Sequence, residues 1–296
     1  MHTTLFNRKE LIKAMEIAVI HAATDNSRPV LNRVNFLKWD DSSVAVVGTD
    51  GYRLSITMIK PSNSNFVNCG IDLKDAKAAI KHLKTLKHLT DVIFEVVPDT
   101  MLIPVQRLKP FCGRIKEYEM VDKEIDIHRI NLAGVEYVSN VGTLPNVKGI
   151  IPDTYNLPSA RVDSAAMLYT LYNPLYVEQV AARKDAVKAL ELQPNRNTKQ
   201  NRLGVEKLYR VTTLYIHNLI NPAKDVMSHF ESVYLNDTFK ALKDSHEVTR
   251  VYLTSINQPL LYIVSGATQV VIMPRKPHDL TNKLEDMKSI TFNLYS

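Results

Sequence analysis

The sequence predicts an α+β protein made of two similar domains, because helices and strands occur in the same order twice along the chain. In each half a helix, a group of strands, a second helix and further strands follow one another. The two helices begin near residues 7 and 72 in the first half, and near residues 163 and 236 in the second. A length of 296 residues also fits two domains of ordinary size.

Hydrophobic periodicity locates the elements of the first half. Apolar residues recur every three or four positions in two segments, which indicates amphipathic helices, and shorter apolar segments bounded by turn residues indicate strands. Gly51 suits a tight turn because glycine readily adopts a positive φ. The predicted helices are 7–22 and 72–89, and the predicted strands are 34–39, 44–47, 52–58, 91–97, 101–105 and 124–131.

The stretch 142–158 contains three prolines and little periodicity, which indicates a connection between domains. Beyond it, Asn236 is a suitable N-cap for a short helix. The predicted helices there start at 163, 177 and 236 and end before Pro174, at 192 and at 243, and the predicted strands are 208–216, 248–254, 260–264 and 268–273. We therefore expect domains at 1–150 and 151–276. A further 20 residues, 277–296, form an added strand, a partner-binding arm or a disordered tail.

The composition is that of an ordinary soluble protein with a modest excess of positive charge. Apolar residues make up 45% of the chain, charged residues 23%, and the formal net charge is +6. Basic proteins often bind polyanions, but many bind no nucleic acid. No apolar run approaches the ~18–20 residues that span a bilayer, and the first nine residues lack the apolar core of a signal peptide. Cys69 and Cys112 fit no metal or redox spacing, so we expect a reducing cytoplasm.

Four segments carry a resemblance to a known family. The most specific is Gly48-Thr49-Asp50-Gly51-Tyr52-Arg53-Leu54, and the others are 29–34, 151–158 and 270–275. In this order and at this spacing they resemble the bacterial β sliding clamp family, the β subunit of DNA polymerase III. The resemblance covers roughly residues 5–275, with a poorly matched stretch at 106–142, and the linker 151–158 is one residue shorter than in the family.

The resemblance implies duplicated DNA-clamp domains, each with two helices packed on antiparallel sheets. The family has three domains per chain, and its ring of six domains is built from two chains, whereas only the last two domains are matched here. Three copies of a two-domain chain would close a similar ring, so we expect a homotrimer. The shortened chain suggests a phage-encoded or divergent bacterial member, which would act in the host cytoplasm if it is phage-encoded.

The function that the resemblance implies is that of a ring-shaped processivity factor, which encircles duplex DNA and tethers a replicative DNA polymerase. Such a protein has no catalytic residues and needs no cofactor. In the family, helices line the hole, and lysines on them attract phosphates without fixing the protein at one sequence. Lysines opposite an apolar stripe are also typical of a solvated helix face. The lysines expected to face DNA are Lys9, Lys13, Lys74, Lys77, Lys81, Lys84, Lys87, Lys240 and Lys243.

The resemblance also implies a pocket for short peptides of the polymerase and the clamp loader. Apolar side chains would anchor such a peptide, and methionine adapts its shape to different partners. The alternative for Leu31, Leu54 and Val271 is an ordinary core position, and for Gly51 and Pro274 a turn. The positions that match the family pocket are Leu31, Thr49, Gly51, Tyr52, Arg53, Leu54, Pro152, Asn156, Leu157, Val271, Met273, Pro274 and Arg275.

Catalytic motifs are not found in the sequence. It contains no Gly-x-x-x-x-Gly-Lys phosphate loop and no Gly-x-Ser-x-Gly nucleophile elbow. Glu124, Asp126 and His128 alternate along a predicted strand as the ligands of a metal site would, but an outward strand face explains them better, and we expect no metal. Two alternative functions stay open. One is a regulatory protein that keeps the clamp fold and binds only partner peptides, and the other is a metal-dependent nuclease that uses Asp126 and His128.

Overall fold

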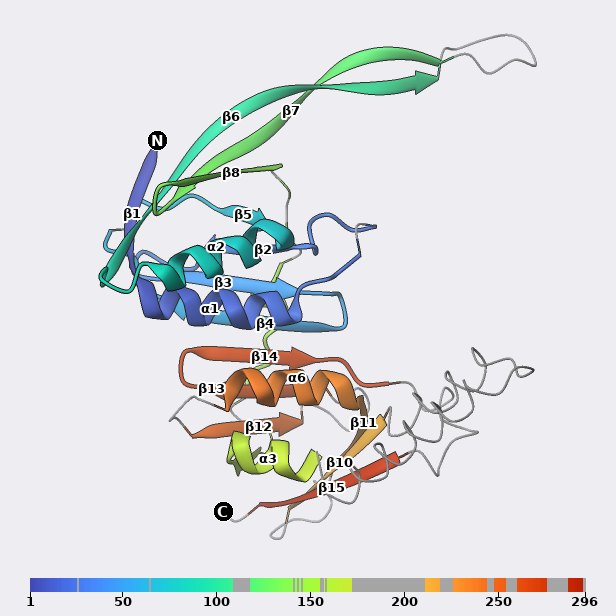
Figure 1. The fold of residues 1–296 in the computed structure, drawn as a ribbon. Helices are drawn as coiled ribbons and strands as arrows, with labels where there is room; N and C mark the ends of the chain where they lie inside the picture. The colour runs from blue at the N-terminus through green and yellow to red at the C-terminus, as the bar shows by residue number, and fades with distance from the viewer. Residues whose placement is uncertain are drawn as a thin grey trace, which may run out of the picture. The chain divides into compact units, whose positions relative to one another are not determined.

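The computed structural model divides the chain into two compact units, which are described here one at a time. Unit 1 comprises Met1–Gly51 and Ser55–Pro145, and unit 2 comprises Tyr52–Leu54 and Asn146–Ser296. Each unit combines helices with sheets (Figure 1), which confirms the predicted α+β class. The structure describes residues 1–25, 27–63, 65–108, 118–140, 142, 144, 146–154, 157, 159–171, 211–218, 226–243, 248–253, 260–275 and 287–294.

Unit 1 contains strands of two sheets. In the first sheet the strand order is β1 (His2–Asn7), β6 (Asp91–Leu108), β7 (Tyr118–Leu132) and β8 (Val135–Asn140), and all neighbours are antiparallel. In the second the order is β5 (Cys69–Asp72), β2 (Arg33–Lys38), β3 (Val44–Thr49) and β4 (Arg53–Ile59), with β2 antiparallel to both β5 and β3. The predicted strands 34–39 and 44–47 are therefore confirmed and pair as a hairpin, whereas β1, β5 and β8 were not predicted.

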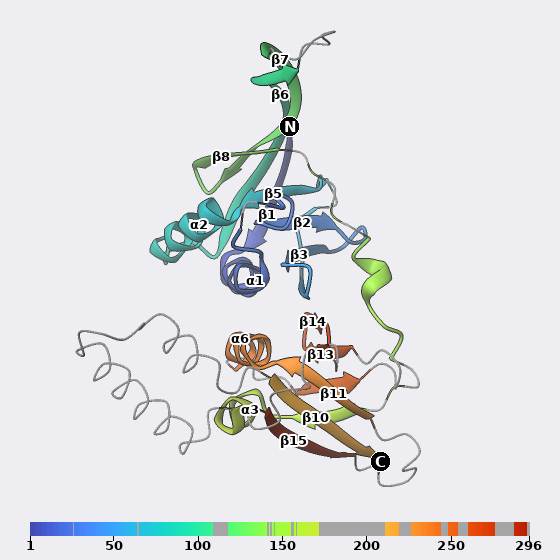
Figure 2. The same ribbon diagram turned by 90° about the vertical axis from the view of Figure 1, so that its right-hand side faces the viewer.

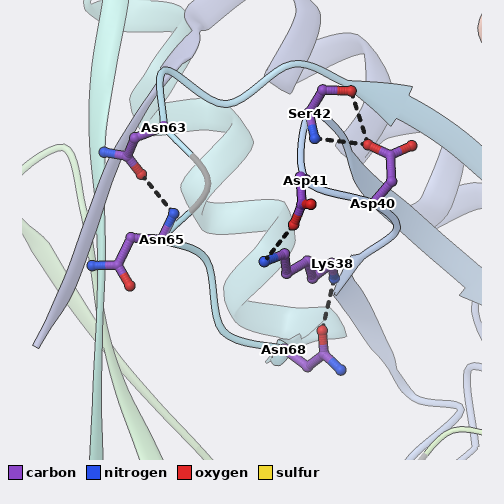
Figure 3. Close-up of polar contacts among 7 residues, drawn as sticks. All are labelled: Lys38, Asp40, Asp41, Ser42, Asn63, Asn65 and Asn68. Carbon is purple, nitrogen blue, oxygen red and sulfur yellow. Dashed lines mark hydrogen bonds and ion pairs between the residues drawn. The ribbon is translucent and has the colours of Figure 1, made fainter.

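Side-chain hydrogen bonds form the turn between β2 and β3 (Figure 3). The Asp40 carboxylate accepts from the backbone N and the Oγ of Ser42 at 2.8 and 2.9 Å. The nearby serines Ser43 and Ser42 lower the pKa of Asp40 to about 2, so the turn keeps its charged acceptor down to acidic pH. Asn68 of the neighbouring loop accepts from Lys38 N at 2.7 Å, and the Lys38 ammonium lies 3.2 Å from the Asp41 carboxylate.

Two helices lie side by side against these strands: α1 (Arg8–His21) and α2 (Leu73–Thr85) (Figure 2). Asn7 starts α1 because its side chain accepts from the N–H groups of Lys9 and Glu10 at 3.0 and 3.2 Å. The apolar faces of both helices enter one core with the strands. Its largest fully buried members are Phe6, Phe36, Phe94, Leu11, Met15, Ile71 and Leu83.

The predicted end of α2 at residue 89 is wrong, because the helix ends at Thr85. The next residue, Leu86, has φ −80° and ψ 48°, outside the helical region. The buried Arg8 guanidinium donates to the carbonyl oxygens of Leu83 at 3.2 Å and Leu89 at 2.8 Å. The Leu83 oxygen also accepts from Leu86 N at 3.3 Å, and Leu89 lies in the turn beyond the helix, so Arg8 anchors both the last turn of α2 and the turn that follows it.

The predicted strands 91–97 and 101–105 are one strand, β6, and the predicted strand 124–131 is part of the longer β7. The sequence Pro98-Asp99-Thr100 resembles a turn, but β6 continues through it in unbroken register with β7. Beyond Val96, β6 has lost its pairing with β1, and proline is tolerated where one edge of a strand is unpaired.

Unit 2 contains a second set of sheets. One has the order β14 (Thr268–Ile272), β13 (Leu261–Ser265), β12 (Thr249–Leu253) and β9 (Ser159–Val162), all antiparallel. The other has the order β11 (Val226–Glu231), β10 (Val211–Asn218) and β15 (Met287–Leu294). The β10–β15 pair is parallel, unlike the expected antiparallel sheets, because β15 comes from the C-terminal extension and not from the duplicated domain. A short 3-10 helix, η1, spans Lys148–Ile150.

Two helices, α3 (Ser164–Leu171) and α6 (Ser232–Leu242), pack together in unit 2. The Asp163 carboxylate caps α3 by accepting from Ala165 N and Ala166 N at 2.7 and 3.0 Å. The predicted N-cap Asn236 is wrong, because α6 begins four residues earlier, after Glu231. Its buried stripe of Leu235, Phe239 and Leu242 includes a residue before Asn236. The predicted helix 177–192 lies outside the described residues.

Gly48 allows α1 to pack closely on β3. A Cβ atom at Gly48 would lie 2.0 Å from the carbonyl oxygen of Ala18, a backbone atom that cannot move aside alone. We expect Gly48→Ala to lower the free energy of unfolding by about 2–3 kcal/mol through overpacking, measured by urea denaturation. The control is Gly134→Ala. Gly134 has φ +87° and no atom within 4 Å of its Cβ position, so only backbone strain of about 1 kcal/mol is expected. Equal losses for the two variants would contradict the steric explanation.

Candidate functional site

Lysine side chains cover the outward surface of the α1–α2 pair. Lys9 and Lys13 on α1, and Lys74, Lys77 and Lys81 on α2, are exposed, while the opposite face of each helix is buried. The two helices lie side by side (Figure 2). We call the set of these five exposed side chains the lysine face. Helix α1 also has two carboxylates near these lysines: Glu10 is exposed and Glu16 is half-buried.

Two of the predicted DNA-facing lysines of unit 1 differ from the rest. The Lys84 ammonium lies 2.6 Å from the Glu16 carboxylate, which joins α2 to α1 and neutralises the charge. Lys87 lies beyond the end of α2, in the turn where its N–H bonds Thr85 O at 2.9 Å. The expectation that Lys87 is on the helix is therefore wrong.

Lys240 and Lys243 are exposed in unit 2, at the C-terminal end of α6. Positive charge at the end of a helix interacts favourably with its unpaired carbonyl groups, so this position has a structural explanation as well.

Three residues of the predicted peptide pocket gather at one place in unit 1. The Ala23 N–H donates to the carbonyl oxygens of Leu31 and Thr49 at 3.0 and 3.2 Å. The Gly51 N–H donates to Thr49 Oγ1 at 3.2 Å, and Gly51 has φ +90°, the positive angle predicted for this turn. Leu31 is buried, with 9% of its surface exposed.

The Tyr52–Leu54 segment belongs to unit 2, where it meets the strand end after β14. Met273 N donates to Tyr52 O at 2.8 Å, and both side chains are exposed, Tyr52 by 61% and Met273 by 49%. Leu54 and Val271 are buried. The structure thus brings an exposed pair, Tyr52 and Met273, together with buried apolar neighbours.

Both arginines of the predicted pocket are ion-paired. The Arg53 guanidinium lies 2.9 Å from the Asp237 carboxylate and 4.6 Å from the centre of the Tyr234 ring. The Arg275 guanidinium pairs with the Glu231 carboxylate, and the backbone N–H of Arg275 donates to His229 O at 2.8 Å. Burial lowers the pKa of His229 and favours its neutral form. Sequence reasoning missed Glu231, Tyr234 and Asp237, because nothing in a sequence pairs residues this far apart.

The remaining pocket positions lie in the connection between domains or next to β14. Pro152, Leu157 and Pro274 are half-buried, and Leu157 N bonds Thr154 O at 3.3 Å. No described contact joins Pro152 or Leu157 to the other pocket residues. Asn156 lies outside the described residues.

The part of the chain that the structure describes contains no candidate metal site. There, no group of three or more His, Cys, Asp and Glu side chains could hold a metal ion. On β7, Glu124 and Asp126 are exposed, whereas His128 is 7% exposed, and burial lowers its pKa. Among these residues, the nuclease alternative therefore has no group of three side chains placed to hold a metal ion. Over the same residues, no helix is long and apolar enough to cross a membrane.

Comparison with known proteins identifies the fold. Residues 5–96 match the family model of the DNA polymerase III beta subunit, central domain. No curated protein sequence matches the chain. Similar solved structures include the DNA polymerase III β chain of Streptococcus pneumoniae TIGR4, with 15% identity and a TM-score of 0.58 over 93% of this chain and 65% of that one.

Two sliding clamps are similar to the same degree. The β sliding clamp of C. crescentus has 12% identity and a TM-score of 0.59, and the clamp of Bartonella birtlesii bound to griselimycin has 17% and 0.56. Each comparison covers 93% of this chain and 66% of the other, so this chain spans just under two thirds of these clamps. The resemblance predicted from the sequence is therefore confirmed, and this chain has the fold of the bacterial β sliding clamps.

Proposed function

We propose that this protein is a DNA sliding clamp, a ring-shaped processivity factor that encircles duplex DNA and tethers a replicative DNA polymerase. The observation that carries the proposal is the lysine face on the α1–α2 pair of a chain with the β-clamp fold. The domains we assign are 1–150 and 151–276, and the place of action is the cytoplasm.

The lysine face suits contact with DNA that slides. Its ammonium groups are exposed on flexible stems and would meet phosphates through counterion release, which depends little on base sequence. The helices that carry these lysines are packed on the core, so the points where the lysine stems attach keep their spacing while the DNA moves. No chemical step is needed for this function.

A ring requires more than one copy of the chain. Because the chain spans 65–66% of clamps whose chains are half a ring, three copies would supply the same number of domains as two of those chains. We therefore propose a homotrimer.

The second proposed surface receives a partner peptide of the polymerase or the clamp loader. Tyr52 and Met273 would supply its exposed apolar contacts, since both are available to a ligand. The ion pairs with Asp237 and Glu231 would hold the side chains of Arg53 and Arg275 in place at the side of the peptide surface. The griselimycin complex of the Bartonella birtlesii clamp shows that a protein of this fold binds a ligand.

The mass of the protein in solution tests the ring. We expect light scattering to give three times the 33.6 kDa of one chain. A monomer would favour the alternative of a non-encircling regulatory protein, and a dimer would contradict the trimer.

Removing charge from α2 tests the DNA contact. We expect Lys74→Gln combined with Lys77→Gln and Lys81→Gln to weaken DNA binding and to reduce the salt dependence of the binding constant by about 2–3 in log–log slope. Fluorescence anisotropy with duplex DNA at several salt concentrations measures both. The matched control replaces three lysines of unit 1 outside the helices, Lys38, Lys60 and Lys123, by glutamine. An equal effect of the two triple variants would show that only net charge matters.

The peptide surface is tested by Tyr52→Ala combined with Met273→Ala. Since both side chains are exposed, we expect the free energy of unfolding to change by less than about 0.5 kcal/mol, and the Kd for a polymerase peptide to rise about 10-fold or more. Titration calorimetry measures the Kd, and light scattering checks that assembly is kept. Val248→Ala, at a position 62% exposed in unit 2, is the control. Unchanged peptide affinity in the double variant would remove this assignment.

A further inference from the structure

The strands β6 and β7 continue well beyond the rest of their sheet (Figure 1). β6 pairs with β1 only over Asp91–Val96, and β7 pairs with β8 only over Ile127–Leu132. Farther out, the two strands pair only with each other, as far as Leu108 and Tyr118. The part with residues 97–104 and 122–126 is here called the arm. A two-stranded ribbon is marginally stable alone, so an arm of this length is expected to rest on a partner.

The free edge of β6 in the arm is poorly suited to strand addition, because among residues 97–104 only Leu102 has an N–H that points to this edge without a recorded bond. Ile93 O accepts from Ala133 N at 2.9 Å on the β7 side, so the even-numbered residues of β6 face the other edge. On that edge Pro98 and Pro104 have no N–H, and the Thr100 N–H is bonded to Asp99 Oδ1 at 2.8 Å. Proline and blocked donors protect edge strands from pairing with another chain. On the β6 side, a partner is therefore expected to bind a face of the arm and not its edge.

One face of the arm is acidic. Asp122, Glu124 and Asp126 alternate along β7, opposite Pro104, Leu102 and Thr100 of β6. Leu102 is 64% exposed among them. These three carboxylates form no ion pair within the described part of the chain, and no lysine or arginine shares their face. On the opposite face Asp99 is already bound to Arg129 at 2.6 Å.

The chemistry of this face selects a basic protein surface. Carboxylates repel phosphate groups, so the acidic face does not suit DNA. Over residues 97–104 and 122–129 the chain has four carboxylates and two cations, although its formal net charge is +6. The rest of each copy therefore carries a net positive charge, which is opposite to the charge of the arm.

Unit 2 contains a surface that fits. Arg161 of β9 and Arg250 of β12 are directly opposite each other in register, and both are exposed. Like charges in this position destabilise a strand pair, so a bound anion would relieve the repulsion. β9 is the last strand of its sheet, which leaves this pair at an edge. Carboxylates two residues apart on the arm are about 7 Å apart, a spacing that two arginine side chains can reach.

We propose that the arm is a clasp between copies of this chain, in which the acidic face of one copy binds the Arg161–Arg250 pair of a second copy. Leu102 would supply the apolar contact at the centre of the charged groups. The clasp rests on the proposed ring, because it presupposes association of the chain with itself. It would add a charged contact to the assembly without using a strand edge.

Charge reversal tests the clasp in the full-length protein. We expect Glu124→Arg with Asp126→Arg, and separately Arg161→Glu with Arg250→Glu, to weaken self-association about 10-fold or more. Sedimentation at several protein concentrations measures it. Combining all four changes in one chain should restore association. Mixing the two variants should restore only two of the three contacts of a trimer, because three copies of two kinds cannot alternate around a ring. The control, Asp41→Arg with Asp91→Arg, reverses two exposed carboxylates of unit 1 outside both the arm and the lysine face, and should associate like the unchanged protein.

The outcomes separate the clasp from the ring. A trimer that neither reversal weakens overturns the clasp and leaves the ring standing. Loss of association without rescue in the chain that carries all four changes also overturns the clasp. A dimer that the reversals weaken and the mixture restores supports the clasp and overturns the trimer, and a monomeric unchanged protein overturns both. If Arg161→Glu with Arg250→Glu lowers only DNA affinity, the pair binds phosphate and the clasp is wrong.

Discussion

The packing of α1 and α2 against the strands of unit 1 is the constraint on which the proposed function depends. Each helix has one apolar face, and burying it in the shared core requires the opposite face to point outward. The lysines occupy that opposite face. The close contact of Gly48 with Ala18 holds α1 on β3, so the position of the charges follows from the packing of small residues below them.

Electrostatic pairing gives the cations of this chain different roles. Arg53 and Arg275 are bound to carboxylates, and Arg8 is buried against carbonyl oxygens at the end of α2, so these three contribute to structure. The lysine face is exposed and suits a diffuse polyanion. The basic pair Arg161 and Arg250 and the acidic arm form a third class, charges that the fold concentrates on exposed strands.

Much of the fold was accessible from the sequence, whereas the candidate site was accessible mainly through the resemblance. The periodicity of Leu11, Met15 and Ala18 located α1, because a helix that packs on a sheet repeats its apolar residues every three or four positions. The same reasoning failed for the end of α2 and the start of α6. There, distant contacts decide the boundary: Arg8 at Leu83 and Leu89 in one case, and the buried Leu235 in the other.

The sequence by itself determined the α+β class, the helix faces that carry lysine and the turn at Gly51, because these depend on residues close together in the chain. Only the tertiary structure decided that Arg53 meets Asp237, that residues 91–108 form one strand, and that β15 pairs with β10. These features depend on residues far apart in sequence. Their pairing is set by how the whole chain buries its apolar surface, and local sequence patterns do not record that.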